Sequence, residues 1–350
     1  MSDTLLRQTA ERLFAARITP ALRVAAERGE WPDAAWAELE NAGLTRALVP
    51  EEAGGFGMEA AEALTVLSVA GQHAVPLPLA ETMLAAWLLA GAGLEIPDGP
   101  LTIAPVSLDD DFTLAPDGDG WRLLGRAKRV PWGRNAEYCV VLTGGGVPRV
   151  ALVPATDWSC GPDENLAREP RDTLRFDALL PRESVAPAAS GIDRAALRAA
   201  GAAMRSLQMA GALAEILAIT TQYALDRKQF GRPIGKFQAI QQNMAILAAQ
   251  QAAATAAADG AAEAMGAGLP MLPIAAAKIR SGEAAGIGAA IAHQVHGAIG
   301  FTYEHRLHFL TKRLWSWRDE FGSEAEWALL LGRHMAEAGA DRLWSEITSA

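Results

Sequence analysis

Apolar positions recur at helical spacing between residues 1 and about 97, a region rich in Ala, Leu and Glu. Two groups show this spacing: Leu5, Leu6, Ala10 and Leu13, and further on Trp36, Leu39 and Leu44. The run Pro-Glu-Glu-Ala-Gly-Gly-Phe-Gly at 50–57 is typical of a turn between helices, and Pro76 and Pro78 interrupt the next helical segment. The pattern predicts a helical domain over residues 1–97.

The pattern changes between residues 98 and 187, where short apolar runs are separated by turn sequences. The strand-like runs are 101–106, 121–124, 137–142 and 149–153. Asp-Gly-Asp-Gly at 117–120 and Gly-Gly-Gly at 144–146 separate some of these runs. Most of the β structure is expected here, which favours a small β-barrel or sandwich.

From about residue 188 to 350 the spacing is helical again. The expected long helices are Ile192–Arg227, Phe237–Met265, Pro273–Val295 and Glu324–Ala338. These segments are rich in alanine, which lets helices pack closely. We expect an antiparallel four-helix bundle, with two of its helices joined at 266–270. The fold class is therefore mainly α, with a small β domain between an N-terminal helical domain and a C-terminal bundle.

Composition narrows the functional classes. The chain has 350 residues, of which 50% are hydrophobic, and a net charge of -10, so a nucleic-acid surface is not expected. Cys139 and Cys160 give neither metal-ligand spacing nor a disulfide framework. The amino terminus lacks the build of a signal peptide, and polar residues interrupt the apolar stretch 248–262, which is therefore a poor membrane span. We expect a soluble, cytoplasmic protein.

The most informative stretch runs from Tyr223 to Gln238 and reads Tyr-Ala-Leu-Asp-Arg-Lys-Gln-Phe-Gly-Arg-Pro-Ile-Gly-Lys-Phe-Gln. A helix carries Arg227 and an amide to its end, breaks at 231–233 and restarts at a second amide. An arginine offers a fixed fork of donors suited to pyrophosphate, and N–H groups at a helix start add to it. Taken alone, Arg227 is better explained as a surface arginine at a helix C-terminus, which the helix dipole favours. The length and specificity of the whole run reverse this preference.

A second stretch, Gln294-Val-His-Gly-Ala-Ile-Gly-Phe-Thr, places Gly297 and Gly300 three residues apart. Glycine lets the backbone approach a ligand closely, but Gly297 would also serve as a helix C-cap. His296 is expected to be a hydrogen-bonded packing residue rather than an acid or base.

These stretches closely resemble the signature of the acyl-CoA dehydrogenases, flavoproteins that desaturate acyl thioesters. The order of helices, β region and helical bundle is also the plan of that family, so the resemblance covers essentially the whole chain. It implies FAD, an acyl-CoA substrate, an electron-transferring flavoprotein as reoxidant and a tetramer. It also implies that the arginine-to-glycine stretch reaches the FAD of a neighbouring subunit. The candidate cofactor-binding residues are Arg227, Gln229, Phe230, Gln238, Gln294, Gly297, Gly300 and Ser323.

The resemblance also indicates where a catalytic base is expected. Family members usually carry a glutamate just before a Gly-Thr or Gly-Ser pair, and burial raises the basicity of such a carboxylate. Ungapped counting places Phe321 at that position, with Glu320 one residue earlier. Glu320 is the candidate base, or alternatively a solvated acid paired with Arg318. Other family members carry the base on the first bundle helix, but no Asp or Glu occurs between Asp193 and Glu215.

The chain departs from the family pattern at other positions. Ala298 replaces the second glycine of a pair, and Pro131 aligns with a threonine that usually hydrogen-bonds the flavin ring. Trp132 is a candidate to cover a ring face, although an aromatic residue in a small β domain is more often core. Residues expected to reach a neighbour's FAD are thus largely present, whereas those for the chain's own flavin ring are weakened.

Two hypotheses follow from this asymmetry. In the first, the chain is an active acyl-CoA dehydrogenase with Glu320 as the base. In the second, it is a non-catalytic or half-site subunit of a hetero-tetramer with a longer, related dehydrogenase. The second pattern resembles short family members that act in the breakdown of bulky thioesters such as steroid side chains.

Overall fold

A computed structural model describes residues 5–144 and 146–348. The chain divides into two compact units, Met1–Val66 with Pro76–Gly201, and Leu67–Val75 with Ala202–Ala350. The predicted division into 1–97, 98–187 and 188–350 follows the change of secondary structure and stays a prediction. The N-terminal helices and helical turns are α1 (Leu5–Arg17), α2 (Pro20–Ala26), α3 (Asp33–Asn41), η1 (Leu44–Arg46), η2 (Glu51–Ala53), α4 (Ala60–Ala63), α5 (Thr65–Gln72) and α6 (Leu79–Ala92).

The first helix buries a slightly different face from the one expected. Leu6, Ala10 and Phe14 are buried and lie four residues apart, so they share one face of α1. Leu5, which the spacing placed on the buried face, is 77% exposed. The aromatic ring of Phe14 therefore takes the core position, and the apolar stripe is rotated away from Leu5. Further along, Trp36, Leu39 and Leu44 are buried as expected.

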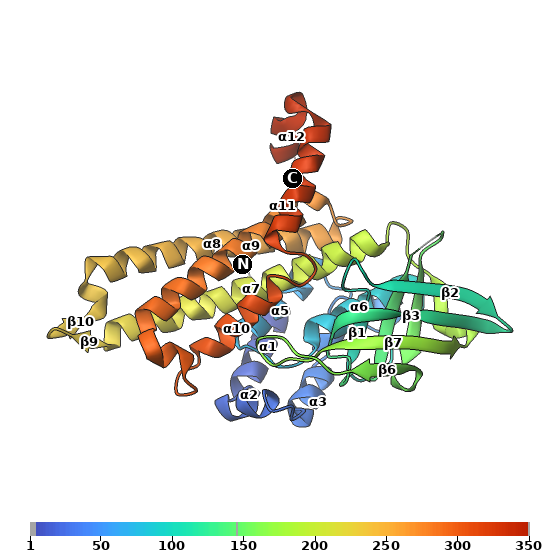
Figure 1. The fold of residues 1–350 in the computed structure, drawn as a ribbon, viewed down its shortest axis with the longest axis horizontal. Coiled ribbons are helices and arrows are strands. Elements are labelled where there is room, and N and C mark those ends of the chain that lie inside the picture. The colour runs from blue at the N-terminus through green and yellow to red at the C-terminus, as the bar shows by residue number, and fades with distance from the viewer. Residues whose placement is uncertain (1–4, 145, 349–350) are drawn as a thin grey trace. The chain divides into compact units, whose positions relative to one another are not determined.

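The β region of the first unit is a sandwich of two four-stranded sheets (Figure 1). One sheet has the order β1 (Leu101–Ala104), β4 (Tyr138–Thr143), β5 (Arg149–Pro154) and β8 (Val185–Pro187). The other has the order β2 (Asp111–Asp117), β3 (Gly120–Pro131), β7 (Arg171–Leu180) and β6 (Trp158–Gly161). Side chains from both sheets form one core, for example Cys139 and Val153 with Leu123 and Phe176.

The pairing register explains which residues enter this core. β3 pairs antiparallel with β7, so that Leu123 lies opposite Ala178, and both are buried. Strand β7 was not predicted from the sequence. Its alternation of buried Leu174, Phe176, Ala178 and Leu180 is the period-two signal of a half-buried strand. A register shift between Ala127 and Val130 bends the end of β3, where Pro131 and Trp132 lie.

The second unit is built from long helices that lie side by side (Figure 1). From Ala202 onward, it contains most of α7 (Arg194–Asp226), followed by β9 (Lys228–Gln229), β10 (Arg232–Pro233), η5 (Ile234–Lys236), α8 (Gln238–Gly266), α9 (Met271–His296), η6 (Gly297–Phe301), α10 (Leu307–Trp317), α11 (Glu324–Ala338), η7 (Ala340–Arg342) and α12 (Leu343–Thr348). The four long helices expected from the sequence are present, and α8 joins α9 at 267–270. Helix α10 was not predicted.

Two glycines allow the segment 67–75 to lie against α7. A Cβ at Gly211 would collide with the backbone oxygen of Ser68, and one at Gly71 would collide with that of Gln208. The two backbones are therefore in direct contact, which explains why this short segment belongs to the second unit. Helix α7 is long and apolar enough to cross a membrane by composition alone, but 78% of its most apolar window is buried inside the protein. This burial is typical of a core helix.

Substitution of Gly211 by alanine is expected to destabilise the protein, because the added methyl group overlaps a backbone atom that cannot rotate away. Overpacking of this kind costs about 1–3 kcal/mol. The matched control is Gly260→Ala in α8, where the new Cβ meets nothing within 4 Å and helix propensity favours alanine by roughly 0.5–1 kcal/mol. Urea unfolding measures both changes, and equal stability of the two variants would contradict the proposed backbone contact.

Candidate functional site

The predicted motif at 223–238 forms a short hairpin at the end of α7 (Figure 1). Gln229 pairs with Arg232, and the two turn residues, Phe230 and Gly231, have φ values of 52° and 78°. Positive φ at both central residues is the signature of a type I′ turn. Glycine adopts this conformation freely, but it costs a phenylalanine about 1–2 kcal/mol. Phe230 is nevertheless 92% exposed, so this costly conformation presents an aromatic ring to the outside of the chain.

A cavity of about 480 Å³ lies where this hairpin meets the end of α9. Its polar wall contains Arg227, Gln229 and Gln294, and its aromatic wall contains Tyr223, Phe230, Phe237 and His296. Residues from the two predicted motifs are therefore brought together, although they lie far apart in the sequence. The other predicted contacts do not line this cavity: Gln238 begins α8, Gly300 is buried in η6, and Ser323 lies before α11.

The two glycines of the second motif have different physical roles. Gly297 has φ 64° and ψ -146°, a conformation essentially restricted to glycine, and it lines the cavity. Gly300 is closely packed, because a Cβ there would lie 3.1 Å from the Cβ of His296 and from Leu307, so these neighbours would have to shift by a small amount. Ser323 is the N-cap residue of α11. Its hydroxyl accepts a hydrogen bond from the N–H of Glu326 within a capping box.

Histidines surround the second motif. The ring of His296 stacks on Tyr223, with centroids 4.4 Å apart, and lies 4.5 Å from the ring of His305. His293 is stacked between Phe301, at 4.0 Å, and Trp315, at 5.6 Å. Burial lowers the pKa of His293 and His296, and it lowers the pKa of His305 to about 4. These rings are therefore neutral near pH 7 and pack as flat aromatic groups.

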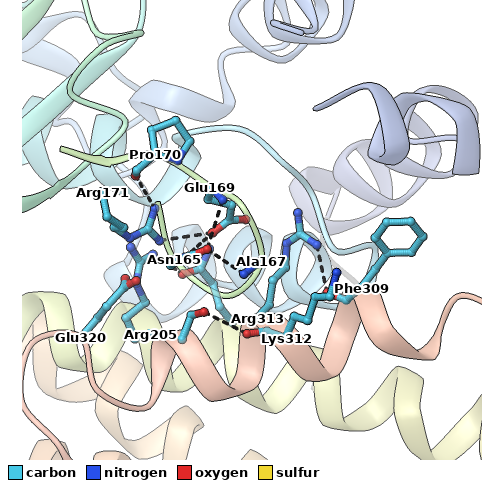
Figure 2. Close-up of polar contacts among 12 residues, drawn as sticks. Asn165, Ala167, Glu169, Pro170, Arg171, Arg205, Phe309, Lys312, Arg313 and Glu320 are labelled. Carbon is cyan, nitrogen blue, oxygen red and sulfur yellow. Dashed lines mark hydrogen bonds and ion pairs between the residues drawn. The ribbon is translucent and has the colours of Figure 1, made fainter. Parts of the chain in front are cut away.

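The candidate base Glu320 is held by an arginine of α7 (Figure 2). The Nε atom of Arg205 lies 2.8 Å from the Glu320 carboxylate, and their side chains are 2% and 9% exposed. Arg205 also donates to Gln208 and lies over the ring of Phe321. The partner considered from the sequence, Arg318, pairs with Glu324 instead. The Glu320 carboxylate is therefore engaged in an ion pair that is largely shielded from solvent, and it is not the solvated acid paired with Arg318 that the sequence left open.

The turn that carries Glu320 is fixed from several sides. Lys278 is buried and donates to the carbonyl oxygens of Trp317 and Arg318, at 3.2 and 2.6 Å. The indole N–H of Trp327 donates to the carbonyl of Phe321 at 2.9 Å. Phe321 itself has φ 56°, an unfavourable value for a phenylalanine, so the turn is held by its surroundings. A one-residue shift that frees Glu320 would disturb all of these contacts.

The β-unit residues considered for a flavin ring have structural roles. The carbonyl of Pro131 accepts a hydrogen bond from the hydroxyl of Thr102 at 2.5 Å, and proline offers no donor in return. Trp132 is buried and meets Trp31 edge-on, with centroids 6.2 Å apart. A nearby loop is stabilised by a buried ion pair between Glu169 and Arg171 (Figure 2). Among residues 5–144 and 146–348, no group of three or more potential ligands could hold a metal ion.

Two groups at these sites were not predicted from the sequence. Tyr223 and Phe237 lie within the stretch 223–238 and line the cavity, but they were not named as candidate contacts; their place inside that stretch was the available signal. Arg205 was also missed, although it is an isolated arginine in an otherwise apolar stretch of α7, a pattern that indicates a buried partner.

Several known proteins are similar to this chain in sequence and in structure. The models described as "Acyl-CoA dehydrogenase, N-terminal domain" and "Acyl-CoA dehydrogenase, C-terminal domain" match residues 2–95 and 194–323. The acyl-CoA dehydrogenase IpdE2 of Mycobacterium tuberculosis is 32% identical over 314 residues, covering 88% of this chain and 89% of its own.

Two solved structures are similar over nearly their whole length. The Tcur3481-Tcur3483 steroid ACAD G363A variant has a TM-score of 0.84 and 28% identity, covering 95% of this chain and 97% of its own. The ChsE4-ChsE5 complex of Mycobacterium tuberculosis has a TM-score of 0.83 and 24% identity, covering 96% and 97%, and supports the fold alone.

The lowered pKa of His305 predicts acid sensitivity. An unfolded chain binds a proton at its ordinary pKa of 6.5, whereas the folded chain binds it near 4, so stability contributed by neutral His305 is present above pH 6.5 and is lost as pH falls toward 4. His305→Asn keeps an acceptor for the N–H of Leu307 and removes the titration. Urea unfolding at pH 7 and pH 5 is expected to show a smaller loss in the variant than in the wild type. An identical loss of unfolding free energy in both proteins would show that His305 is not the group responsible for the acid sensitivity.

Proposed function

Because this chain belongs to the acyl-CoA dehydrogenase family of oxidoreductases, we propose that it is a subunit of an FAD-dependent acyl-CoA dehydrogenase and supplies part of a flavin-nucleotide site. One observation carries the proposal: an exposed phenylalanine in a costly turn conformation stands beside a cavity lined by arginine and amide side chains. Such an arrangement is maintained against its cost when a ligand or a neighbouring subunit covers it.

The residues around the cavity fit the nucleotide part of FAD. Arg227 would hold the pyrophosphate with its fork of donors, and the amides of Gln229 and Gln294 would bond polar groups of the ligand. Phe230 offers a ring face to the adenine, and Gly297 lets the backbone approach. When bound, the flavin would supply the hydride acceptor for α,β-desaturation of an acyl-CoA, with an electron-transferring flavoprotein as the onward acceptor.

The residues that would surround the flavin ring fit less well. Pro131 cannot donate a hydrogen bond where the family pattern has a threonine, and Trp132 is engaged in the core of its own unit. Glu320 is ion-paired with Arg205, so its carboxylate is already engaged within this chain. We therefore propose that the remaining part of the site, including the base, comes from a related and longer dehydrogenase chain in a hetero-tetramer.

The similar proteins favour a bulky substrate for this assembly. The Tcur3481-Tcur3483 structure is named for two chains together and is described as a steroid ACAD. By analogy we propose a bulky thioester, such as a steroid-derived acyl-CoA, as the substrate class. Many side chains of α8 and α9 are alanine. Such small side chains are compatible with a wide substrate pocket, but equally with close packing between helices.

A second candidate is a homo-tetramer in which Glu320 of this chain is the base. The observation in its favour is that Glu320 is a largely shielded carboxylate, 9% exposed, in the same turn as Phe321, the position aligned with the family's base. Its ion pair with Arg205 argues against this role.

Substitution of Glu320 by glutamine separates the two candidates. If a partner chain supplies the base, dehydrogenase activity of the assembly is expected to stay within about threefold, since general acid–base loss costs about 10²–10⁴-fold. The assay follows reduction of an artificial acceptor by a panel of acyl-CoA thioesters. Oligomeric state and urea stability of the variant serve as controls, because loss of the ion pair also weakens the fold. A drop of 10²-fold or more in an intact assembly would instead assign the base to Glu320.

The proposed nucleotide contact predicts an effect of Arg227 on cofactor release. Arg227→Met removes a charge-assisted bond worth about 1.5–3 kcal/mol, so release of FAD is expected to rise on the order of 10- to 100-fold. Fluorescence of the freed flavin measures the rate. The matched control is Arg232→Met in the same hairpin, because Arg232 packs over Phe237 and does not line the cavity. Equal release rates in the two variants would exclude Arg227 from the site.

A further inference from the structure

The two halves of the candidate site are carried by two different helix ends. Arg227 and the hairpin follow the end of α7, whereas Gln294 and Gly297 lie at the end of α9. A ligand that bridges both halves requires a fixed spacing between these ends. Tyr223 of α7 and His296 of α9 contact each other between the two helix ends, and both residues line the cavity.

The contact between these two rings is well defined. Their centroids are 4.4 Å apart and their planes differ by 25°, and the Tyr223 hydroxyl points to the carbonyl of His296 at 3.4 Å. The ring of His296 cannot turn freely, because its Nδ1–H donates to the carbonyl of Ala292 at 2.8 Å. Its Nε2 is buried without a hydrogen-bond partner in the described part of the chain. The imidazole is thus held neutral, in one tautomer and one orientation.

Both rings are directly connected to the candidate ligand contacts. The N–H of Arg227 donates to the carbonyl of Tyr223, and the N–H of Ile234, beyond the hairpin, donates to the carbonyl of Arg227. Tyr223 therefore lies one helical turn before Arg227, and a backbone hydrogen bond joins the two residues. On the other side, His296 is the last residue of α9 and directly precedes Gly297. Movement of one ring relative to the other would change the distance between the two halves.

An apolar cluster under the rings has a separate role. Ala224, Ile234 and Val295 are buried against each other and hold the helix ends together. The free energy gained by burying these aliphatic side chains has no preferred direction. The ring stack is directional and lies at the cavity wall. Loss of the stack is therefore expected to change the site more than it changes the stability of the fold.

We propose that Tyr223 and His296 are positioning residues, whose ring stack holds the hairpin half and the glycine half of the flavin-nucleotide site at the spacing that the ligand requires. This proposal rests on the proposed function for the identity of the ligand. The stack itself is a property of the chain and can be tested without the cofactor.

The first test compares Tyr223→Phe with Tyr223→Leu in the assembly purified through a tag on this chain. Phenylalanine keeps the ring, so FAD release is expected to stay within about twofold of the wild type. Leucine removes an aromatic pair worth about 0.5–1.5 kcal/mol, so release is expected to rise on the order of 2- to 10-fold. Tyr138→Leu, in β4 of the other unit, is the matched control for the loss of a tyrosine ring.

The second test uses the same assembly after its flavin has been removed. Hydrogen exchange of the amides at 227–234 and 294–301 is expected to be faster in Tyr223→Leu than in the wild type, and unchanged in Tyr223→Phe. Amides of α11 serve as an internal reference. If Tyr223→Leu does not fold, His296→Gln removes the other ring and is expected to give the same increase in release and exchange.

The outcomes separate the two proposals. An assembly that never contains flavin would overturn the proposed function, while the exchange measurement would still test the stack. Flavin-containing assemblies with equal release and equal exchange in Tyr223→Leu and Tyr223→Phe would overturn the positioning role.

Discussion

The spacing between the C-terminal ends of α7 and α9 is the constraint on which the candidate site depends. Each end alone carries an ordinary feature: an arginine before a hairpin on one, a glycine cap on the other. Only when the two ends lie together do Arg227 and Gln294 face one cavity. Burial of the apolar cluster around Ile234 and Val295 holds the two helix ends together. The stack of Tyr223 on His296 adds a contact between the ends that depends on their relative orientation.

The polar residues at the turn after α10 are arranged differently from those at the cavity. Near the cavity, polar side chains face an open space, whereas at this turn they are paired with each other and buried. Arg205, Lys278 and Trp327 fix a backbone in which Phe321 has a positive φ value. The same chain thus has an open cavity lined by Arg227 and Gln294, and a turn whose carboxylate, Glu320, is ion-paired. This contrast supports our proposal that the chain has a supporting role in a larger dehydrogenase.

Much of the architecture followed from the sequence because periodicity reports burial directly. The long helices and four of the strands lie where apolar spacing placed them, and the family resemblance predicted the order of helical and β regions. The predicted contacts Arg227, Gln229, Phe230, Gln294 and Gly297 do meet at one cavity. Their role toward a cofactor stays a prediction.

Other features depended on pairing across the chain and could not be read from local pattern. The partner of Glu320 is Arg205, which lies 115 residues away in the sequence. Proximity in sequence had suggested Arg318, but that guanidinium pairs with Glu324. Similarly, Gly300, which was predicted as a ligand contact, does not line the cavity and is closely packed against the side chains of His296 and Leu307. Such roles follow from three-dimensional neighbours, which motif spacing does not specify.

A density map of the assembly purified through this chain, obtained by electron cryomicroscopy or crystallography, tests the central claim most directly. We expect a flavin nucleotide whose pyrophosphate lies within hydrogen-bond reach of Arg227, with the side chain of Gln294 also in contact, and whose flavin ring is bound by a partner chain. A map in which the assembly contains no flavin, or in which the nucleotide lies away from both side chains, would contradict it.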